Sequence, residues 1–439
     1  MYLRPRYQLL RNISSIFFKP RNPLAACLHL EGCCPELTEG EPKMLMTDVR
    51  MKLHDIVGAS KIWREHLKSA EERSSLSFPP VESQDSLPFR SMKDSYLEVF
   101  LPLGSQPLLR EKYLNVHNLV RFGRILEDLD SFGVLISYTH AKTDSPRSPF
   151  SIVTALVDEI DLVKNVILPD CDLKFTGHVT WVGRSSMEVQ MHILQYQNGT
   201  FLPVIDATFV MVARDTSNKS PAFINPLKTE SPEEEILFRQ GDLNKATRTA
   251  MKQTSLLKTA PNEDERKVIH EMFLETLDDK TISFRSRILP INSVWMEDTK
   301  LKSLEICHPQ ERNIFNKIFG GFLMRKAFEL AWATACVYGG SRPSAAAVDD
   351  ILFQRPVEIG ALLYLSAQVC YTKGEYIQVR VHCTVVDPVT KERNTTNIFH
   401  FTLVSEKEVM QVFPKSYGES MLYLDGKRHF KARFNKDSN

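Results

Sequence analysis

Two glycines that open a long apolar segment are the first residues that could do chemistry. Gly320 and Gly321 precede apolar side chains spaced by three and four residues, which predicts a helix with a wide apolar surface. Free N–H groups in the first turn of a helix attract negative charge, and glycine lets a ligand come close to the backbone. We therefore expect this helix start to hold a carbonyl oxygen. His308, in the polar segment before it, is interpreted either as a supporting residue or as an ordinary loop histidine.

Carboxylates on an earlier helix form the second candidate group. The apolar pattern from Gly123 to Tyr138 predicts a helix that also carries Asp128 and Asp130. At about 100° per residue, Asp130 lies about 40° from Leu126, at the edge of the apolar stripe. A carboxylate at that edge would face a partner domain or a cleft. The alternative for both acids is exposure to solvent, which the helix dipole favours in early turns.

Glu329, on the later helix, is the third candidate carboxylate. It lies in one row with apolar residues of that helix, so it would be buried unless it were paired. The alternative to a functional role is an ion pair with Arg325 or Lys326 at helical spacing.

Short β-type runs surround both helices, and the whole pattern occurs twice. Runs of β-branched and aromatic residues separated by turn residues predict strands, and one helix among antiparallel strands predicts an α+β unit. NVHNLVRFG from Asn115 is echoed by NIFNKIFGG from Asn313, and TALVDEI from Thr154 by AAVDDI from Ala346. Two copies are too few for a solenoid. The chain is therefore a duplication that forms a pseudo-symmetric pair.

These patterns divide the chain into successive segments. The segments are a presequence (1–21, with cleavage as late as about 45), a helix from Thr47 to Ala70 with its connector (47–88), a first α+β domain (92–215), a helical linker (216–288), a second α+β domain (289–405) and a C-terminal tail (406–439).

The presequence carries a targeting pattern. MYLRPRYQLLRNISSIFFKPR interleaves Arg and Lys with Leu, Ile and Phe and contains no acidic residue. This basic, amphipathic composition is typical of a mitochondrial transit peptide, and a frayed terminus is the alternative. We expect the mature protein in the mitochondrial matrix or at the surface of the inner membrane.

Composition excludes several classes of protein. The chain is 43% hydrophobic and 25% charged, with a formal net charge of +1. It shows no basic excess of the kind that nucleic acids require. No apolar run approaches the roughly 18 to 20 residues of a membrane-spanning helix. Its 8 cysteines form no CxxC pair and no Cys/His cluster with zinc-like spacing. We therefore expect reduced thiols and no metal.

Two motifs resemble those of a known family. HPQERNIFNKIFGGFLMRKAFELA, from His308, resembles the HP-N-GG helix signature of acyl-coenzyme A thioesterases with the hot-dog fold, and RFGRILEDLDSFG, from Arg121, resembles its partner helix. Two such units cover residues from about 92 to 405. The resemblance implies a tandem hot-dog, in which a curved antiparallel sheet wraps one long helix in each unit and the units pair through their sheets. It also implies hydrolysis of acyl-CoA without a separate cofactor, in a homo-oligomer that is a trimer of such pairs.

The same resemblance implies a composite site between the two copies. The motif asparagine is Asn313, and the acid on the helix of the other unit is Asp130. Asp130 would act as a base, or else as a nucleophile, and Asn313 would orient the water. The N–H groups at Gly320 and Gly321 would polarise the thioester carbonyl.

At the mirror position, the motif asparagine would lack an acid. Asn115 would meet Phe328 there, although Glu329 stands next to it, so we expect one active site. A catalytically silent acyl-CoA-binding module is the alternative, because fold alone does not separate binding from catalysis. A hot-dog hydratase would need an Asp/His dyad that the sequence lacks, and no GxSxG elbow of a serine hydrolase occurs.

A turn in the first copy is the candidate contact for coenzyme A. Gly183, Arg184, Ser185 and Ser186 follow a strand and could approach phosphate or pantetheine groups. An ordinary β-turn is the alternative.

Overall fold

The computed structural model describes residues 43–75, 81, 83–145, 147–162, 166–215, 220–278, 280, 284 and 286–434. The expected transit peptide at residues 1–21 lies outside this part of the chain. Among the described helices, none combines the length and the apolar character that a membrane span requires.

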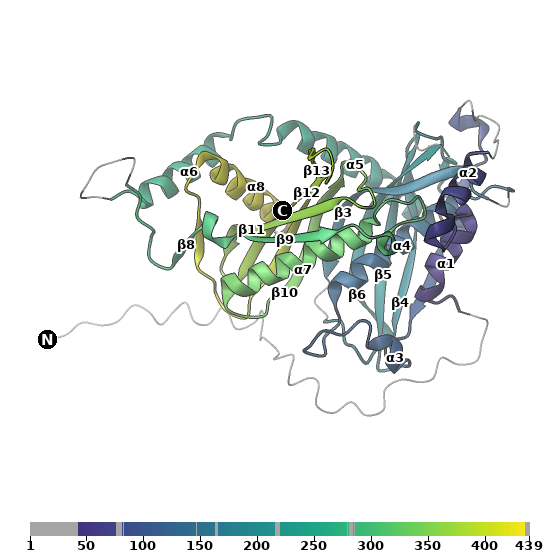
Figure 1. Cartoon of the computed structure of the whole chain (residues 1–439), viewed down its shortest axis with the longest axis horizontal. Helices are drawn as coiled ribbons and strands as arrows, with labels where there is room; N and C mark the ends of the chain where they lie inside the picture. The colour runs from purple at the N-terminus through teal and green to yellow at the C-terminus, as the bar shows by residue number, and fades with distance from the viewer. Residues whose placement is uncertain are drawn as a thin grey trace. The chain divides into compact units, whose positions relative to one another are not determined.

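One antiparallel sheet runs through both copies (Figure 1). Its ten described strands follow the order β2-β4-β5-β6-β3-β10-β13-β12-β11-β9. The first half consists of β2 (Leu97–Leu101), β3 (Phe150–Leu162), β4 (Leu173–Val182), β5 (Ser186–Gln197) and β6 (Thr200–Asp215). The second half consists of β9 (Leu301–Ile306), β10 (Ser344–Phe353), β11 (Leu362–Lys373), β12 (Tyr376–Val386) and β13 (Arg393–Val404). β3 and β10 join the halves, with Val157 opposite Ile351 and Ile160 opposite Val348.

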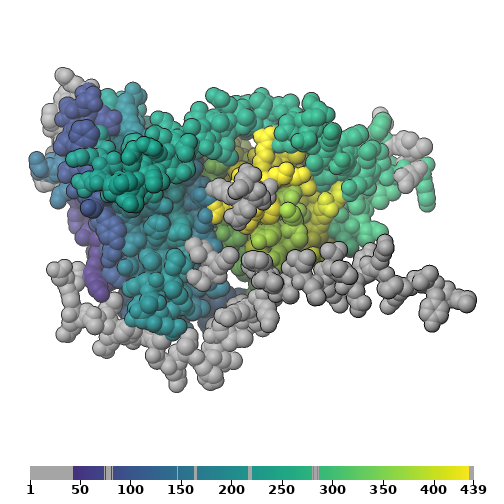
Figure 2. Space-filling view, turned by 180° about the vertical axis from the view of Figure 1, so that it is seen from behind, coloured from purple at the N-terminus to yellow at the C-terminus, as the bar shows by residue number. Residues whose placement is uncertain are grey.

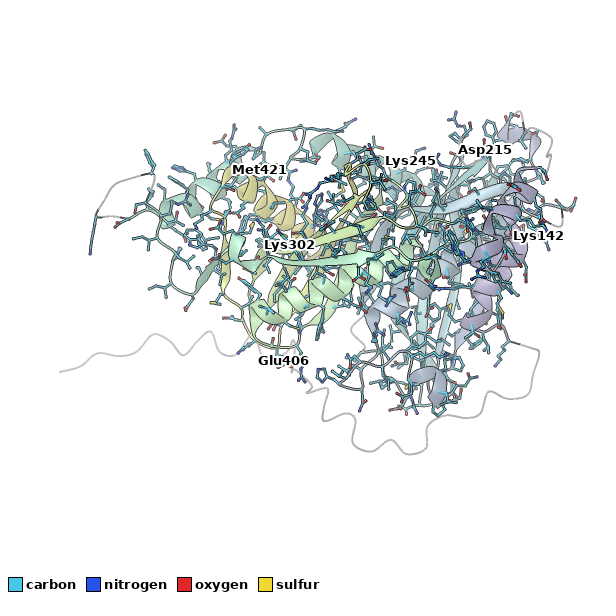
Figure 3. The ribbon with its side chains drawn as sticks, viewed as in Figure 1. Lys142, Asp215, Lys245, Lys302, Glu406 and Met421 are labelled. Carbon is cyan, nitrogen blue, oxygen red and sulfur yellow. The ribbon has the colours of Figure 1, made fainter. Side chains whose placement is uncertain are left out.

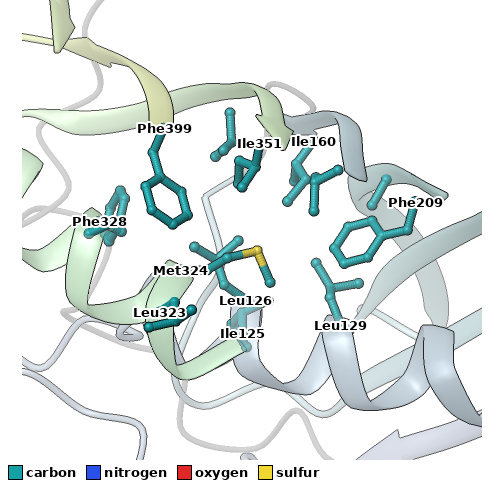
Figure 4. Packing of buried hydrophobic residues seen from close by; sticks show 14 of the residues in the cluster. Ile125, Leu126, Leu129, Ile160, Phe209, Leu323, Met324, Phe328, Ile351 and Phe399 are labelled. Atoms are coloured by element: carbon teal, nitrogen blue, oxygen red, sulfur yellow. The ribbon is translucent and has the colours of Figure 1, made fainter. Parts of the chain in front are cut away.

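Two central helices pack against this sheet and against each other. α4 (Phe122–His140) contacts β3 to β6, and α7 (Gly320–Gly339) contacts β9 and β11 to β13. The apolar residues that predicted α4 are buried, and Figure 4 shows Ile125 and Leu126 beside Leu323 and Met324 of α7. Each half is a hot-dog unit, as the family resemblance implied. α4 begins one residue earlier and ends two residues later than its apolar pattern indicated.

The prediction of one N-terminal helix from Thr47 to Ala70 is wrong. α1 (Met46–Val57) ends at Gly58, which has φ of 71° and donates its N–H to the carbonyl of His54 at 2.8 Å. A left-handed residue at this position terminates a helix, and glycine adopts that conformation without a Cβ clash. α2 (His66–Ser74) is a separate helix. α1 packs against α4, and its buried face consists of Met46, Val49, Leu53 and Val57.

The N-terminal helices also reach the second copy. Arg73 of α2 donates to the carbonyl of Ile314 at 3.0 Å, and Arg312 donates to the carbonyl of Lys61 at 2.8 Å. The guanidinium of Arg50, on α1, lies 4.9 Å from the ring centroid of Phe319. α1, α2 and the segment between them therefore contact the loop that leads into α7.

Further helices lie outside the central pair. α5 (Pro232–Thr254) packs on β4, and α8 (Tyr417–Phe434) packs on β11 to β13. The C-terminal residues, yellow in Figure 2, form part of the surface seen from behind. Figure 3 labels Lys245 on α5 and Met421 on α8. The remaining α-helices and strands of the described residues are α3 (Pro107–Arg110), α6 (Glu263–Glu275), and the two parallel pairs β1 (Arg90–Ser91) with β7 (Leu227–Lys228) and β8 (Ser293–Trp295) with β14 (Gln411–Phe413).

Candidate active site

Asp130 lies buried where the two central helices meet. Only 2% of the surface of Asp130 is exposed to solvent. One carboxylate oxygen, Oδ2, accepts a hydrogen bond from the backbone N–H of Gly321 at 2.6 Å. The other, Oδ1, accepts from the hydroxyl of Thr154 on β3 at 2.5 Å. An acid from the first copy is therefore held by the helix start of the second copy, and both of its oxygens are oriented.

The surroundings of Asp130 bring the pKa of its carboxyl group closer to neutral pH. Burial raises the pKa of Asp130 to about 6, while the hydrogen bonds from Thr154 and Gly321 and the charge of Arg50 act in the opposite direction. A base with a pKa close to the working pH combines a large deprotonated fraction with a strong tendency to take a proton. Asp130 is thus suited to general base catalysis.

The two glycines at the start of α7 differ in whether their N–H groups are already hydrogen-bonded. The N–H of Gly321 was expected to polarise a carbonyl, but it donates to Asp130. A Cβ on Gly321 would lie 2.8 Å from the backbone Cα of Glu127, so only glycine lets α7 start this close to α4. The N–H of Gly320, one residue earlier, has no acceptor among the described residues. Gly320 is therefore one amide at this helix start that can bind a substrate oxygen.

Asn313 lies in the small hairpin that leads into α7. Its side-chain oxygen accepts from the backbone N–H groups of Phe315 at 2.8 Å and Lys317 at 3.1 Å. Asn115 accepts the equivalent pair of bonds in the first copy. The oxygen of Asn313 is thus used to form the turn, while its amide NH₂ has no acceptor among the described residues.

Comparison with known proteins assigns the family. The chain is 66% identical over 402 residues to acyl-coenzyme A thioesterase 9, mitochondrial, of Bos taurus, which covers 91% of this chain and 92% of that protein. The protein of the same name from Homo sapiens is 67% identical over 386 residues, covering 88% of each chain. The chain belongs to the acyl-coenzyme A thioesterases. Like these relatives, this thioesterase is mitochondrial.

Other comparisons are more distant. No family model matches the chain. A solved acyl-CoA hydrolase from Staphylococcus aureus, in complex with butyryl coenzyme A and coenzyme A, is 25% identical, with a TM-score of 0.31, covering 33% of this chain and 94% of that one. A putative oleoyl thioesterase from Lactobacillus plantarum is 10% identical, with a TM-score of 0.44, covering 71% of this chain and 97% of that one.

Asp128 faces away from the start of α7. It accepts a hydrogen bond from the hydroxyl of Tyr113 at 2.8 Å. Burial raises the pKa of Asp128 to about 7, although the bond from Tyr113 and the charge of Arg50 lower it. Asp128 is therefore neither a simple solvent-exposed acid nor a partner of the α7 amides in this thioesterase.

Glu329 and His308 lie outside this cluster. The alternative interpretation of Glu329, an ion pair with Arg325 or Lys326, does not hold, because both cations pair with other carboxylates. Glu329 is half-buried and instead pairs with Arg121 of the first copy at 2.6 Å. His308 is exposed at the start of a short 3₁₀ turn, in agreement with its interpretation as a loop histidine.

At the mirror position, beside the Asn115 hairpin, the second copy has no counterpart of the carboxylate of Asp130 or of the hydroxyl of Thr154. Phe328 replaces the acid, and its ring packs edge-on against Phe122 with centroids 4.9 Å apart. In the internal alignment of TALVDEI with AAVDDI, Ala345 replaces Thr154. Thr154 is the site residue that sequence reasoning missed, and this hydroxyl-to-methyl difference between copies was the signal that could have found it.

The turn expected to contact coenzyme A connects β4 to β5. The carbonyl of Gly183 accepts from the side chain of Gln84 at 2.8 Å, and the carbonyl of Arg184 accepts from the N–H of Ile224 at 3.2 Å. The Arg184 side chain is exposed. Ser185 and Ser186 also take part in backbone bonds, at 2.8 and 2.7 Å. No hydrogen bond among the described residues connects this turn to Asp130.

Proposed function

We propose that the composite site between α4 and α7 hydrolyses acyl-CoA thioesters to a free fatty acid and coenzyme A. The observation that carries this proposal is the buried carboxylate of Asp130, held by Gly321 and Thr154 beside the N–H of Gly320, which has no acceptor among the described residues. A Cβ on Gly320 would lie 3.0 Å from Oδ2 of Asp130, so the site places a base beside an oxyanion donor, the two groups that thioester hydrolysis requires.

In the proposed reaction Asp130 removes a proton from water, and the resulting hydroxide attacks the thioester carbonyl carbon. The N–H of Gly320, at the positive end of the α7 dipole, stabilises the oxyanion. Collapse of the tetrahedral intermediate breaks the C–S bond, and the proton held by Asp130 passes to the coenzyme A thiolate. Because both oxygens of Asp130 accept hydrogen bonds, we propose that it acts as a base rather than as a nucleophile. The chemistry calls for no cofactor beyond the coenzyme A of the substrate.

The amide NH₂ of Asn313 is proposed to orient the attacking water, and one substitution tests this role. Asn313→Asp keeps the oxygen that forms the turn but removes the NH₂ group. We expect the rate of thiol release from acyl-CoA to fall about a hundredfold, as for a misplaced reactant. Asn115→Asp makes the same exchange in the mirror hairpin and should leave the rate unchanged. Equal rates in both variants would remove Asn313 from the mechanism.

The pKa of Asp130 predicts the acidic limb of the pH profile. Since the base must be deprotonated, kcat/KM should fall tenfold per pH unit below about 6, the pKa of Asp130. Thr154→Val removes a hydrogen bond that lowers this pKa, so the limb should move to higher pH while activity in alkaline buffer is partly retained. A limb that stays in place in Thr154→Val would contradict the assignment of the titrating group.

Two finer features belong to the same proposal. We infer from its residue types, and from the exposed side chain of Arg184, that the turn of Gly183 to Ser186 contacts coenzyme A. We also infer that three chains form the homo-oligomer. An apolar patch on β9 and β11 supports burial in an assembly, because Leu304, Ile306 and Tyr364 are 51%, 54% and 41% exposed.

A further inference from the structure

Three side chains that can bind a metal ion meet where α8 packs on the sheet. His400 lies on β13, and Asp425 and His429 lie on α8. One ligand atom of each lies within 4.8 Å of those of the others. Phe399 and Phe401, which flank His400, are fully buried, and Phe401 contacts Phe328 of α7. Because side chains alternate along a strand, His400 points to the opposite face of the sheet, away from Asp130.

The spacing of the two α8 residues suits chelation. Residues four apart in a helix project from the same face, so Asp425 and His429 both point at β13. Pairs of ligands at this spacing hold zinc in helical metal motifs. The rings of His400 and His429 are stacked, with centroids 3.9 Å apart and an interplanar angle of 21°. The helix and the strand therefore contribute ligands from two sides.

The polar side chains of this cluster do not hydrogen-bond to one another. The Nε2 atom of His400 and the Oδ2 atom of Asp425 are 3.7 Å apart, and the Nε atom of Arg380 lies 4.0 Å from the same oxygen. These distances exceed hydrogen-bond length. The Nδ1 atom of His400 is buried without a partner among the described residues, in a residue only 4% exposed. Nε2 is the nitrogen of His400 that faces Asp425, and no hydrogen bond among the described residues uses it, so it is available to an ion.

A further carboxylate lies near His400. Asp349 stands opposite His400 on β10, in the same row of the sheet.

We propose that His400, Asp425 and His429 form a binding site for a divalent transition-metal ion of the zinc class, which fastens α8 to the sheet. Two imidazoles and one carboxylate are ligands that zinc accepts, at about 2.0–2.2 Å and in tetrahedral geometry, and a water would take the fourth position. Binding requires the ligand atoms to draw together, which opens the imidazole stack and moves the α8 side chains toward β13. Arg380 opposes the ion electrostatically, but it does not hydrogen-bond to Asp425.

The proposed ion would strengthen a connection between the two halves. Arg433, near the end of α8, pairs with Glu159 and Asp161 on β3. β3 also carries Thr154, the partner of Asp130. The site lies on the other face of the sheet from the reacting groups, so the metal has a structural role and the hydrolytic mechanism does not involve it.

Zinc titration of the full chain tests the site. Protein stripped with a chelator and dialysed would be titrated with Zn²⁺ by calorimetry, and with Co²⁺ by visible absorption. The wild type should bind one equivalent that Asp425→Asn and His429→Ala each weaken by at least about a hundredfold, since even outer partners of metal ligands change affinity 10- to 100-fold. Zn²⁺ should also raise the Tm of the wild type, but not of the two variants.

His270→Ala provides the matched control. His270 is exposed on α6, so this variant should bind like the wild type and report any non-specific binding by surface histidines. Zinc bound by cysteines would persist in all variants, and its Co²⁺ complex would show thiolate charge-transfer absorption. The absence of an equivalent in the wild type, or its persistence in Asp425→Asn and His429→Ala, would overturn the proposal.

Discussion

Replacing Asp130 by asparagine is expected to lower kcat for acyl-CoA hydrolysis by about 10²- to 10⁴-fold, the usual contribution of a positioned general base. The amide has the same shape but cannot take a proton from water. It can still accept a hydrogen bond from Gly321 or Thr154, so the contact between α4 and α7 should persist. The Tm should be equal to or higher than that of the wild type, because the substitution removes a charge that burial disfavours.

Asp128→Asn is the matched control on the same helix. It also removes a carboxylate whose pKa is raised by burial, but this carboxylate bonds to Tyr113 and not to α7. Steady-state assays of thiol release should therefore show most of the wild-type rate. If Asp128→Asn lost as much activity as Asp130→Asn, the role of base would pass to Asp128. If Asp130→Asn were fully active, the proposed mechanism would be wrong.

Replacing Glu127 by alanine is expected to lower the free energy of unfolding by about 3–5 kcal/mol, the usual cost of breaking a buried ion pair. Glu127 is 3% exposed and pairs with Arg124 at 2.7 Å and with Arg325 of α7 at 2.9 Å. Its removal leaves the guanidinium of Arg325, whose side chain is 11% exposed, without its nearest carboxylate. Glu127 and Arg325 occupy equivalent positions of the two copies, so the loss falls on the contact that holds the halves together.

Glu235→Ala serves as the control for Glu127→Ala. Glu235 pairs with Arg239 on the surface of α5, where both side chains are more than half exposed. Surface pairs of this kind contribute about 0.3–0.5 kcal/mol. Urea unfolding followed by circular dichroism would compare the variants, and a double replacement of Glu127 and Arg325 by Leu and Met should recover much of the loss. Equal destabilisation by Glu127→Ala and Glu235→Ala would show that the buried pair has no special role.

The sequence by itself determined the duplication, the two central helices and the asymmetry between the copies. Helical periodicity and glycine-rich helix starts are local features, so they are visible in a few consecutive residues. Placing the repeats side by side showed that the acid at Asp130 has Phe328 as its counterpart. The composite site itself was implied by the resemblance to hot-dog thioesterases, and the comparison of the two copies then led us to expect only one such site.

Only the tertiary structure decided which groups in the two copies meet. The bond from Gly321 to Asp130 joins residues 191 positions apart, and the pair of Arg121 with Glu329 spans 208. Such contacts depend on how α4 and α7 cross, which no local pattern encodes. The same holds for Thr154, whose role depends on the pairing of β3 with its neighbours, and for His400, which meets Asp425 and His429 only because α8 folds back over the sheet. Local spacing predicts elements, whereas hydrogen bonds and ion pairs depend on distances of a few ångströms between elements.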